Sequence, residues 1–383
     1  MQFLFDEEQL QLQRLVREFA LRELLPQYTR WDRSGEFPTA LWRRLGDLGL
    51  TGARVPAIYG GQEMSAVATG IVAEEVARGD FNLSYGVLLP ALCGEVLREH
   101  ATERVRREWL PPMAAGEAIV GLALTEPGAG SDAKAMRTVA RRDGDEYVLS
   151  GEKTGVSLTM AAHAFVLFAK TDPAAGARGV SAFMVPADRP GLTRTPLQDM
   201  GSRSIQRGTI YLDDVRVPAD HLIGRENTGF YQVMQGFDFS RSLIGLMCIG
   251  AAAQSLEETM AYVKQREAFG QPLARFEGVS FPLAEHATLL EAARWLCYRG
   301  LALKDAGLPH TKEAAMAKYL APKVSVEAIH ECLLLHGHYG YTQDLPIEQR
   351  LRDVIGLEIG DGTAQIAKLV VVRELMGREA LPY

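Results

Sequence analysis

The sequence predicts an α+β fold with helical domains at both ends of the chain and a β-domain between them. Two changes of pattern carry this prediction. Helical periodicity gives way to short β-branched or aromatic runs near residue 117, and long runs rich in Ala, Leu, Glu and Lys return at Gly229. We therefore expect an N-terminal α-helical domain over residues 1–116, a middle antiparallel β-barrel or sandwich over residues 117–228, and a C-terminal four-helix bundle over residues 229–383.

Helical periodicity marks the first domain. Leu12, Leu15, Val16 and Phe19 fall at positions i, i+3, i+4 and i+7 in a polar background, which is the pattern of one buried helix face. Similar patterns, separated by Pro and Gly breaks, predict further helices over residues 41–50, 66–77 and 105–115.

Turn-forming clusters at residues 142–145 and 172–176 separate the short runs of the middle domain. The strands that these runs predict cover residues 118–124, 147–150, 164–170, 180–186 and 208–217. The last domain contains four long helical segments, which are enough for a bundle. These segments cover residues 230–265, 280–306, 311–335 and 364–379.

The composition is that of an ordinary soluble globular protein, with 383 residues, 47% hydrophobic and 23% charged. A formal net charge of −7 argues against nucleic acid as the main partner. The four cysteines lack metal-binding spacing, so we expect reduced thiols. The first residues are too few and too acidic for a signal peptide, and no apolar run reaches the length of a membrane span. We therefore expect a cytoplasmic protein that has no membrane partner.

Three segments contain residues suited to binding or catalysis. Residues 125–132, Thr-Glu-Pro-Gly-Ala-Gly-Ser-Asp, fit either a tight turn after a strand or a loop that brings N–H groups and hydroxyls to a planar ring or a phosphate. Residues 151–157, Gly-Glu-Lys-Thr-Gly-Val-Ser, fit a hairpin connection. Residues 265–270, Gln-Arg-Glu-Ala-Phe-Gly, predict a helix end capped by Gly. There Arg266 either offsets the helix dipole or binds a phosphate.

Two segments nearer the C-terminus complete the set. His336 and His338 lie two residues apart in a predicted break between helices, and without a third ligand they are a weak metal signal, so no metal is expected. Asp361, in Gly-Asp-Gly-Thr, is by itself a turn signal. Together with residues 125–132, it becomes a candidate carboxylate base.

In this order, the motifs resemble those of the flavin-dependent acyl-CoA dehydrogenase family over essentially the whole chain. They occupy residues 124–132, 151–153, 265–270, 337–341, 352–353 and 361–365. The resemblance implies non-covalently bound FAD, an acyl-CoA substrate and an electron-transfer flavoprotein as the electron acceptor. It also implies a homotetramer or dimer in which neighbouring subunits share the cofactor sites.

The resemblance also implies a set of cofactor-binding residues. Thr125 would lie near the isoalloxazine ring, Ser157 would hydrogen-bond flavin N5, and Arg266 would neutralise the FAD pyrophosphate of a neighbouring subunit. The whole set is Leu122, Leu124, Thr125, Ser131, Gly155, Val156, Ser157, Arg266, Phe269, Glu277, Leu334, Gly337, His338, Thr363 and Gln365. Glu277, Leu334 and His338 depart from the usual residues of the family, so some cofactor contacts are expected to differ.

For the substrate, the resemblance implies binding by Ser131, Asp238, Arg241, Gly360 and Gly362, with Asp361 as the base that removes the α-proton. Burial should raise the pKa of this base towards that of the activated substrate. The family usually carries Glu at the base position. Some members carry the base instead at the position of Ser240, which leaves Asp361 as the matching carboxylate.

Two glycines replace bulky residues of the family. Gly155 occupies the position at which the family usually has a Trp that covers the flavin. Gly360 occupies the position at which the family commonly has an aromatic residue before the base. Either the pocket is wider and admits a branched or cyclic acyl group, as in alicyclic acyl-CoA dehydrogenases, or neighbouring side chains refill the space.

Other activities and a non-enzymatic role also remain open. An Asp base also fits a flavoprotein oxidase similar to nitroalkane oxidase, and a dehydrogenase of carrier-protein thioesters is a further alternative. The non-enzymatic alternative is a flavin-free binding homologue.

Overall fold

The computed structural model describes residues 4–382. Its N-terminal part is helical, and three of its helices begin at side-chain caps. Asp6 and Gln9 form a reciprocal capping box at α1, and Ser65 and Thr102 accept hydrogen bonds from the first turns of α4 and α6. The helices are α1 (Glu7–Phe19), α2 (Tyr28–Ser34), α3 (Thr39–Asp47), α4 (Ala66–Gly79), α5 (Tyr85–His100) and α6 (Glu103–Ala114).

Helix α5 was absent from the sequence prediction. Almost every residue from Tyr85 to Leu97 is buried, so both faces of the helix are apolar and no helical period is visible in the sequence.

The middle of the chain forms an eight-stranded sheet with the order β6-β7-β3-β2-β4-β5-β8, in which β1 also pairs with β4. Most neighbours are antiparallel, as predicted. The exceptions are β1, which runs parallel to β4, and a parallel bridge from Val139 of β2 to Lys170 of β4. The strands are β1 (Val120–Ala123), β2 (Val139–Asp143), β3 (Glu146–Val156), β4 (Ala164–Lys170), β5 (Val180–Pro186), β6 (Leu192–Pro196), β7 (Gly208–Pro218) and β8 (Leu222–Ile223).

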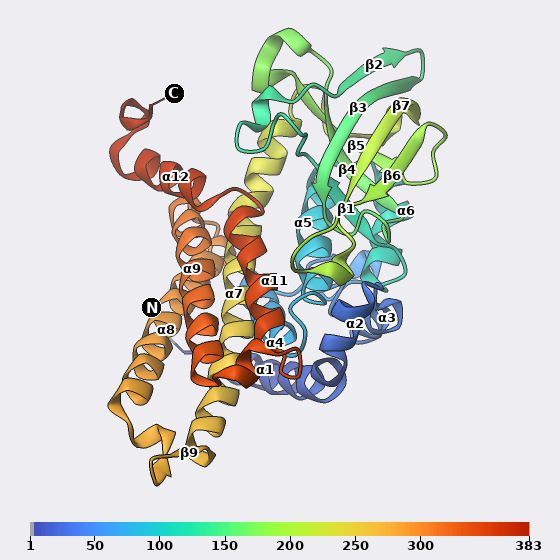
Figure 1. Ribbon diagram of the computed structural model, residues 1–383. Helices are drawn as coiled ribbons and strands as arrows, with labels where there is room; N and C mark the ends of the chain where they lie inside the picture. Colours follow the sequence, from blue (N-terminus) through green and yellow to red (C-terminus); the bar gives the residue numbers. More distant parts are fainter. Residues whose placement is uncertain (1–3, 383) are drawn as a thin grey trace.

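Helices form the C-terminal part, and the long ones run side by side next to the sheet and the N-terminal helices (Figure 1). They are α7 (Gly229–Gln265), α8 (Glu277–Asp305), α9 (Thr311–Leu335), α10 (His338–Tyr341), α11 (Ile347–Ile359) and α12 (Ala364–Met376). The sequence prediction lacked α11, which packs against α9 and α7. Its apolar stripe through Ile347, Val354 and Leu357 is short and lies between two breaks, so the pattern is weak.

Two details of α7 differ from the sequence expectations. By length and composition it is apolar enough to cross a membrane, but nearly all of its apolar stretch is buried inside the protein, as in a core helix. The helix also ends at Gln265 without a Gly cap, because Arg266 is extended. Phe269 and Gly270 instead form the turn between β9 (Glu267–Ala268) and β10 (Gln271–Pro272), with φ values of 52° and 79°.

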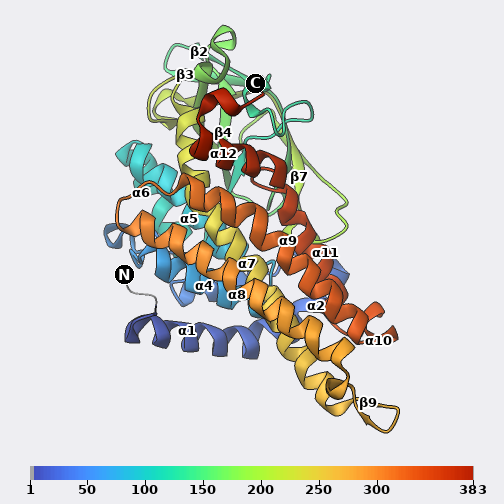
Figure 2. The ribbon, with the colours of Figure 1, turned by 90° about the vertical axis from the view of Figure 1, so that its left-hand side faces the viewer.

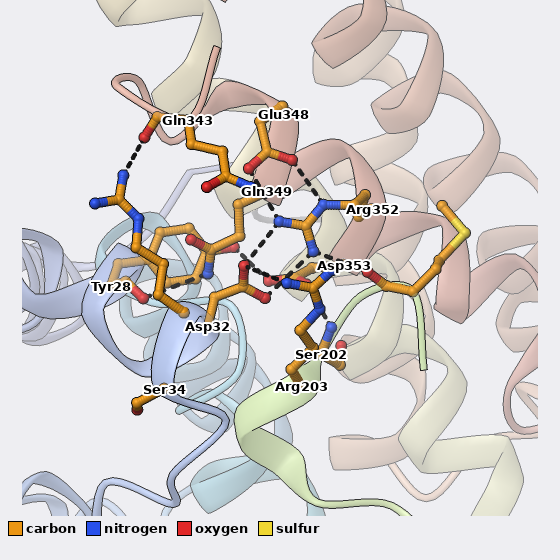
Figure 3. Close-up of polar contacts among 12 residues, drawn as sticks. Tyr28, Asp32, Ser34, Ser202, Arg203, Gln343, Glu348, Gln349, Arg352 and Asp353 are labelled. Atoms are coloured by element: carbon orange, nitrogen blue, oxygen red, sulfur yellow. Dashed lines mark hydrogen bonds and ion pairs between the residues drawn. The ribbon is translucent and has the colours of Figure 1, made fainter. Parts of the chain in front are cut away.

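A buried polar junction joins the three parts of the chain (Figure 3). The Asp353 carboxylate of α11 accepts hydrogen bonds from the Tyr28 hydroxyl at 2.6 Å, the Asn82 amide at 3.0 Å and the backbone N–H of Ser202. Beside it, Arg352 forms an ion pair with Asp32 at 2.8 Å. Because both residues belong to α11, the junction fixes the helix that leads to Asp361.

Candidate active site

A cavity of about 990 Å³ lies among the sheet, α5, α7 and the turn between α11 and α12. Residues of the two motifs that are furthest apart in sequence meet in its wall: Thr125 and Ser131 come from the loop after β1, and Asp361 from the turn after α11. The predicted site residues that line this cavity are Leu122, Leu124, Thr125, Ser131, Gly155, Val156, Ser157, Arg241, Gly360, Asp361, Gly362 and Thr363.

A buried ion pair anchors the loop after β1. The Lys153 ammonium group, which is fully buried, donates to Glu126 at 2.8 Å and to the Leu124 carbonyl at 3.0 Å. Glu126 also accepts from the backbone N–H groups of Arg137 and Thr138. Burial lowers the pKa of Lys153 to about 8. Burial opposes ionisation of Glu126 too, but Lys153 and the hydrogen bonds from Thr138 and Arg137 together outweigh it and lower the pKa of that carboxyl. Residues 125–132 and residues 151–157 are therefore joined by a buried ion pair between Glu126 and Lys153. The sequence analysis did not predict this structural role.

Asp361 is partly buried and lies in a left-handed backbone conformation with φ of 55°, which Asp tolerates better than most residues. Its Oδ2 accepts a hydrogen bond from the Ser240 hydroxyl at 3.2 Å. Burial raises the pKa of the Asp361 carboxyl, as expected, against the opposing effects of Lys318, Ser240, Arg241 and Arg207. At the position where some family members carry the base, this chain thus has the Ser240 hydroxyl, which donates a hydrogen bond to the Asp361 carboxylate.

Asp238 and Arg241 are neighbours on α7 but differ in their access to the cavity. Arg241 lines the cavity and donates to Asp238 at 3.2 Å. Asp238 lies outside the lining and also accepts from the Thr311 hydroxyl at 2.6 Å. In this structure, therefore, Asp238 holds Arg241 in place.

The two glycines that replace bulky residues have different surroundings. A Cβ added to Gly155, whose φ is +66°, would meet nothing within 4 Å, so this space stays open. A Cβ added to Gly360 would lie 3.3 Å from Leu357 Cδ2, so there a neighbour fills part of the space.

The sequence analysis did not predict several polar residues of the cavity, among them Arg207 and Tyr85. Arg207 forms an ion pair with Asp199 at 2.6 Å, donates to the Tyr85 hydroxyl at 3.3 Å and reaches Ser157 Oγ at 3.4 Å. Tyr85 is buried at the start of α5, the helix that was not predicted. No local pattern marks either residue, because their contacts join segments far apart in the sequence.

Nearly the whole chain matches models of known protein domains. Its residues 6–117, 121–215 and 227–376 match models of the N-terminal, middle and C-terminal domains of acyl-CoA dehydrogenase. The chain belongs to the acyl-CoA dehydrogenase family.

Relatives and solved structures agree with this assignment. A probable acyl-CoA dehydrogenase of Bacillus subtilis, YngJ, is 37% identical over 98% of this chain and 100% of its own. The mitochondrial short-chain specific acyl-CoA dehydrogenase of Bos taurus is 37% identical over 95% of this chain and 89% of its own. The structure of butyryl-CoA dehydrogenase from Megasphaera elsdenii superimposes with a TM-score of 0.95 at 31% identity, over 98% of this chain and 100% of the other.

This acyl-CoA dehydrogenase is an FAD enzyme, and the cavity fits the flavin. A Cβ at Gly130 or Gly155 would meet no atom within 4 Å, which leaves the backbone open to a flat ring. Thr125, Ser131 and Ser157 place hydroxyl-bearing side chains in the same lining. Hydroxyls can donate to or accept from the heteroatoms of the ring.

The other predicted cofactor residues lie outside the lining of this cavity. Gln365 is exposed at the start of α12. The rest cluster near the β9–β10 hairpin and α10, at the opposite end of the bundle from the turn between α11 and α12 (Figure 2). They are Arg266, Phe269, Glu277, Leu334, Gly337 and His338. Phe269 is 97% exposed. The chain by itself thus does not bring these residues to the cavity that contains Asp361.

His336 and His338 also separate in space. The His336 ring is buried, contacts the Cys332 carbonyl through Nδ1 and stacks on Tyr262, whereas His338 is exposed. Within residues 4–382, no group of three or more His, Cys, Asp or Glu side chains is arranged to hold a metal ion.

Proposed function

We propose that this enzyme removes the α-proton and the β-hydride of an acyl-CoA thioester, with Asp361 as the α-proton base. The supporting observation is the partly buried Asp361 carboxylate, which lines the same cavity as Thr125 and Ser157 of the flavin-binding motifs. When bound, FAD supplies the acceptor for the β-hydride. As the resemblance implies, an electron-transfer flavoprotein then takes the electrons.

The chemistry requires a base of raised proton affinity. An α-proton of a thioester is a weak acid, and burial of Asp361 brings the pKa of its carboxyl closer to that of the substrate. The Ser240 hydroxyl, 3.2 Å from Asp361 Oδ2, orients the carboxylate. Ser157 would bind the N5 edge of the flavin, and Arg241 would support the base from α7.

The side of the cavity formed by α5 and α7 suits an apolar acyl group. Leu88, Leu89, Leu92, Phe237 and Ile244 line it. The open space at Gly155 supports a branched or alicyclic acyl group over a purely linear one, although Leu357 removes part of the corresponding space at Gly360.

We also propose a homotetramer in which the exposed Arg266 reaches the FAD of a neighbouring subunit. The supporting observation is the position of Arg266 at the far end of the bundle from the cavity of its own chain.

Substitution of Asp361 by Asn tests the base. The variant should retain FAD but lose acyl-CoA-dependent bleaching of the flavin under anaerobic conditions by roughly 100-fold or more, since general base catalysis contributes about that much. Asp344→Asn, at an exposed position before α11, is the matched control. Substantial residual bleaching in Asp361→Asn would place the base elsewhere.

A panel of linear, branched and alicyclic acyl-CoA esters in the same assay identifies the acyl group. Oxygen consumption with a nitroalkane would favour the oxidase alternative. Turnover of a carrier-protein thioester where CoA esters fail would favour the carrier-linked alternative.

A further inference from the structure

A fully buried lysine lies directly behind the turn that carries Asp361. Lys318 belongs to α9, and its ammonium group donates to the Leu357 carbonyl at 2.8 Å and to the Gly362 carbonyl at 2.9 Å. These two carbonyls stand on either side of Asp361 in the chain. One cation therefore joins the end of α11 to the residue that follows the base.

The backbone at this point needs such a link. Leu357 lies in the last turn of α11, where carbonyls have no partner further along the helix. Asp361 and Gly362 both have positive φ, 55° and 95°, so the chain turns sharply at the base. A cation at a helix C-terminus also interacts favourably with the helix dipole. Lys318 thus satisfies carbonyls on both sides of a left-handed turn.

The charge of Lys318 also acts on Asp361. It opposes the effect of burial on the Asp361 carboxyl and is the largest of the influences that lower the pKa of that group. Burial in turn lowers the pKa of Lys318 to about 8, while Asp361 favours its charged form. The other titratable groups facing this pair include Cys248 and Arg241 of α7, Tyr85 and Cys93 of α5, Glu358 of α11 and Arg207 before β7. Arg373 of α12 acts on Arg241.

We propose that Lys318 is a positioning residue that holds the turn around Asp361 and keeps its carboxylate ionised for proton abstraction. Lys318 contacts backbone carbonyls of the protein, so it acts through Asp361. The inference rests on the proposed role of Asp361 as the base.

Three variants test this role. Lys318→Met removes the charge at similar length, Lys318→Arg retains it, and Lys323→Met is the control, because Lys323 lies on the same helix with its side chain 60% exposed. The measurement is the anaerobic rate of flavin reduction by a saturating acyl-CoA across the pH range, together with FAD content and thermal melting.

In Lys318→Met, loss of the positive charge should raise the pKa of Asp361. The acid limb of the rate profile should therefore move up by about one pH unit, which is within the range that a nearby opposite charge produces. Looser positioning should also lower the plateau rate by roughly 10- to 100-fold. Lys318→Arg should restore the acid limb, and Lys323→Met should match the wild type.

An unmoved acid limb in a folded, FAD-containing Lys318→Met variant would overturn the proposal. So would an equal loss of rate, without movement of the limb, in the Met and Arg variants, because that result indicates packing alone. If Lys318→Met fails to fold, Lys318→Gln decides, because its amide is neutral but can still donate hydrogen bonds to backbone carbonyls. The acid limb of its rate profile should also move up, and an unmoved limb in a folded, FAD-containing Lys318→Gln variant would overturn the proposal.

The outcome for Asp361→Asn separates this inference from the proposed function. If Asp361→Asn remains active, the proposed function fails. If Asp361→Asn is inactive while Lys318→Met behaves as the wild type, only the role of Lys318 fails.

Discussion

Replacement of Asp80 by Asn should stabilise the protein at mildly alkaline pH and change its stability little at acidic pH. Asp80 is buried between α4 and α5, and its carboxylate accepts from the backbone N–H groups of Asn82 and Leu83 at 2.8 and 3.1 Å. An Asn side chain retains an acceptor oxygen for these two groups. Burial raises the pKa of Asp80 to about 7, and the nearby carboxylates of Asp353 and Asp32 add to this effect.

The direction of the effect follows from proton linkage. Because the pKa of Asp80 is higher in the folded than in the unfolded protein, the folded state binds its proton more tightly, and stability falls as pH rises from about 4 to about 7. A difference of about three pKa units corresponds to about 4 kcal/mol, since each unit is worth about 1.4 kcal/mol. Local rearrangement reduces this, so we expect Asp80→Asn to gain about 2–4 kcal/mol relative to the wild type near pH 8.

Urea unfolding of the FAD-containing protein at several pH values between about 4.5 and about 8 measures this difference. Asp213→Asn, at an exposed position in β7, is the control. The reasoning fails if Asp80→Asn and the wild type differ by the same amount at every pH, or if the variant is less stable near pH 8. Either result would mean that Asp80 is not a buried carboxylate that resists ionisation.

Two other predictions concern the loop after β1 and the far end of the bundle. Lys153→Met should lower the free energy of unfolding by about 3–5 kcal/mol, because Glu126 then remains buried without its cation; a loss below about 1 kcal/mol in urea unfolding would contradict this. Arg266→Ala should weaken FAD retention, because the proposed pyrophosphate contact loses its charge. Flavin content after dialysis measures this, and unchanged content would rule out that role.

Local patterns predicted the elements that have one polar and one apolar face. The pattern through Val16 and Phe19 became α1 (Glu7–Phe19), and the segment at residues 41–50 became α3 (Thr39–Asp47). Helix α5 escaped prediction because it is apolar on both faces, and α11 because its stripe is short. Amphipathic periodicity reports a boundary between core and solvent, so it is silent where an element is buried on all sides.

The sequence likewise identified some residues of the candidate site and left others unidentified. Thr125, Ser157 and Asp361 were identified from the motifs, and all three line one cavity. Arg207 and Lys318 carry no motif. A signal for Lys318 was nevertheless present, because it lies on the same face as the buried residues Ala314 and Ala321, where a lysine is unexpected.

By itself, the sequence determined the class of fold, the family and the identity of the candidate base. Periodicity depends on neighbouring residues, and the order of the motifs can be seen directly along the chain. Only the tertiary structure decided the surroundings of that base: the carbonyls around Asp361 are held by Lys318, the space at Gly155 is open, and Leu357 partly fills the space at Gly360. The physical reason is that proton affinity and cavity shape depend on burial and on charges a few ångströms away. In this protein, those charges come from segments far apart along the chain.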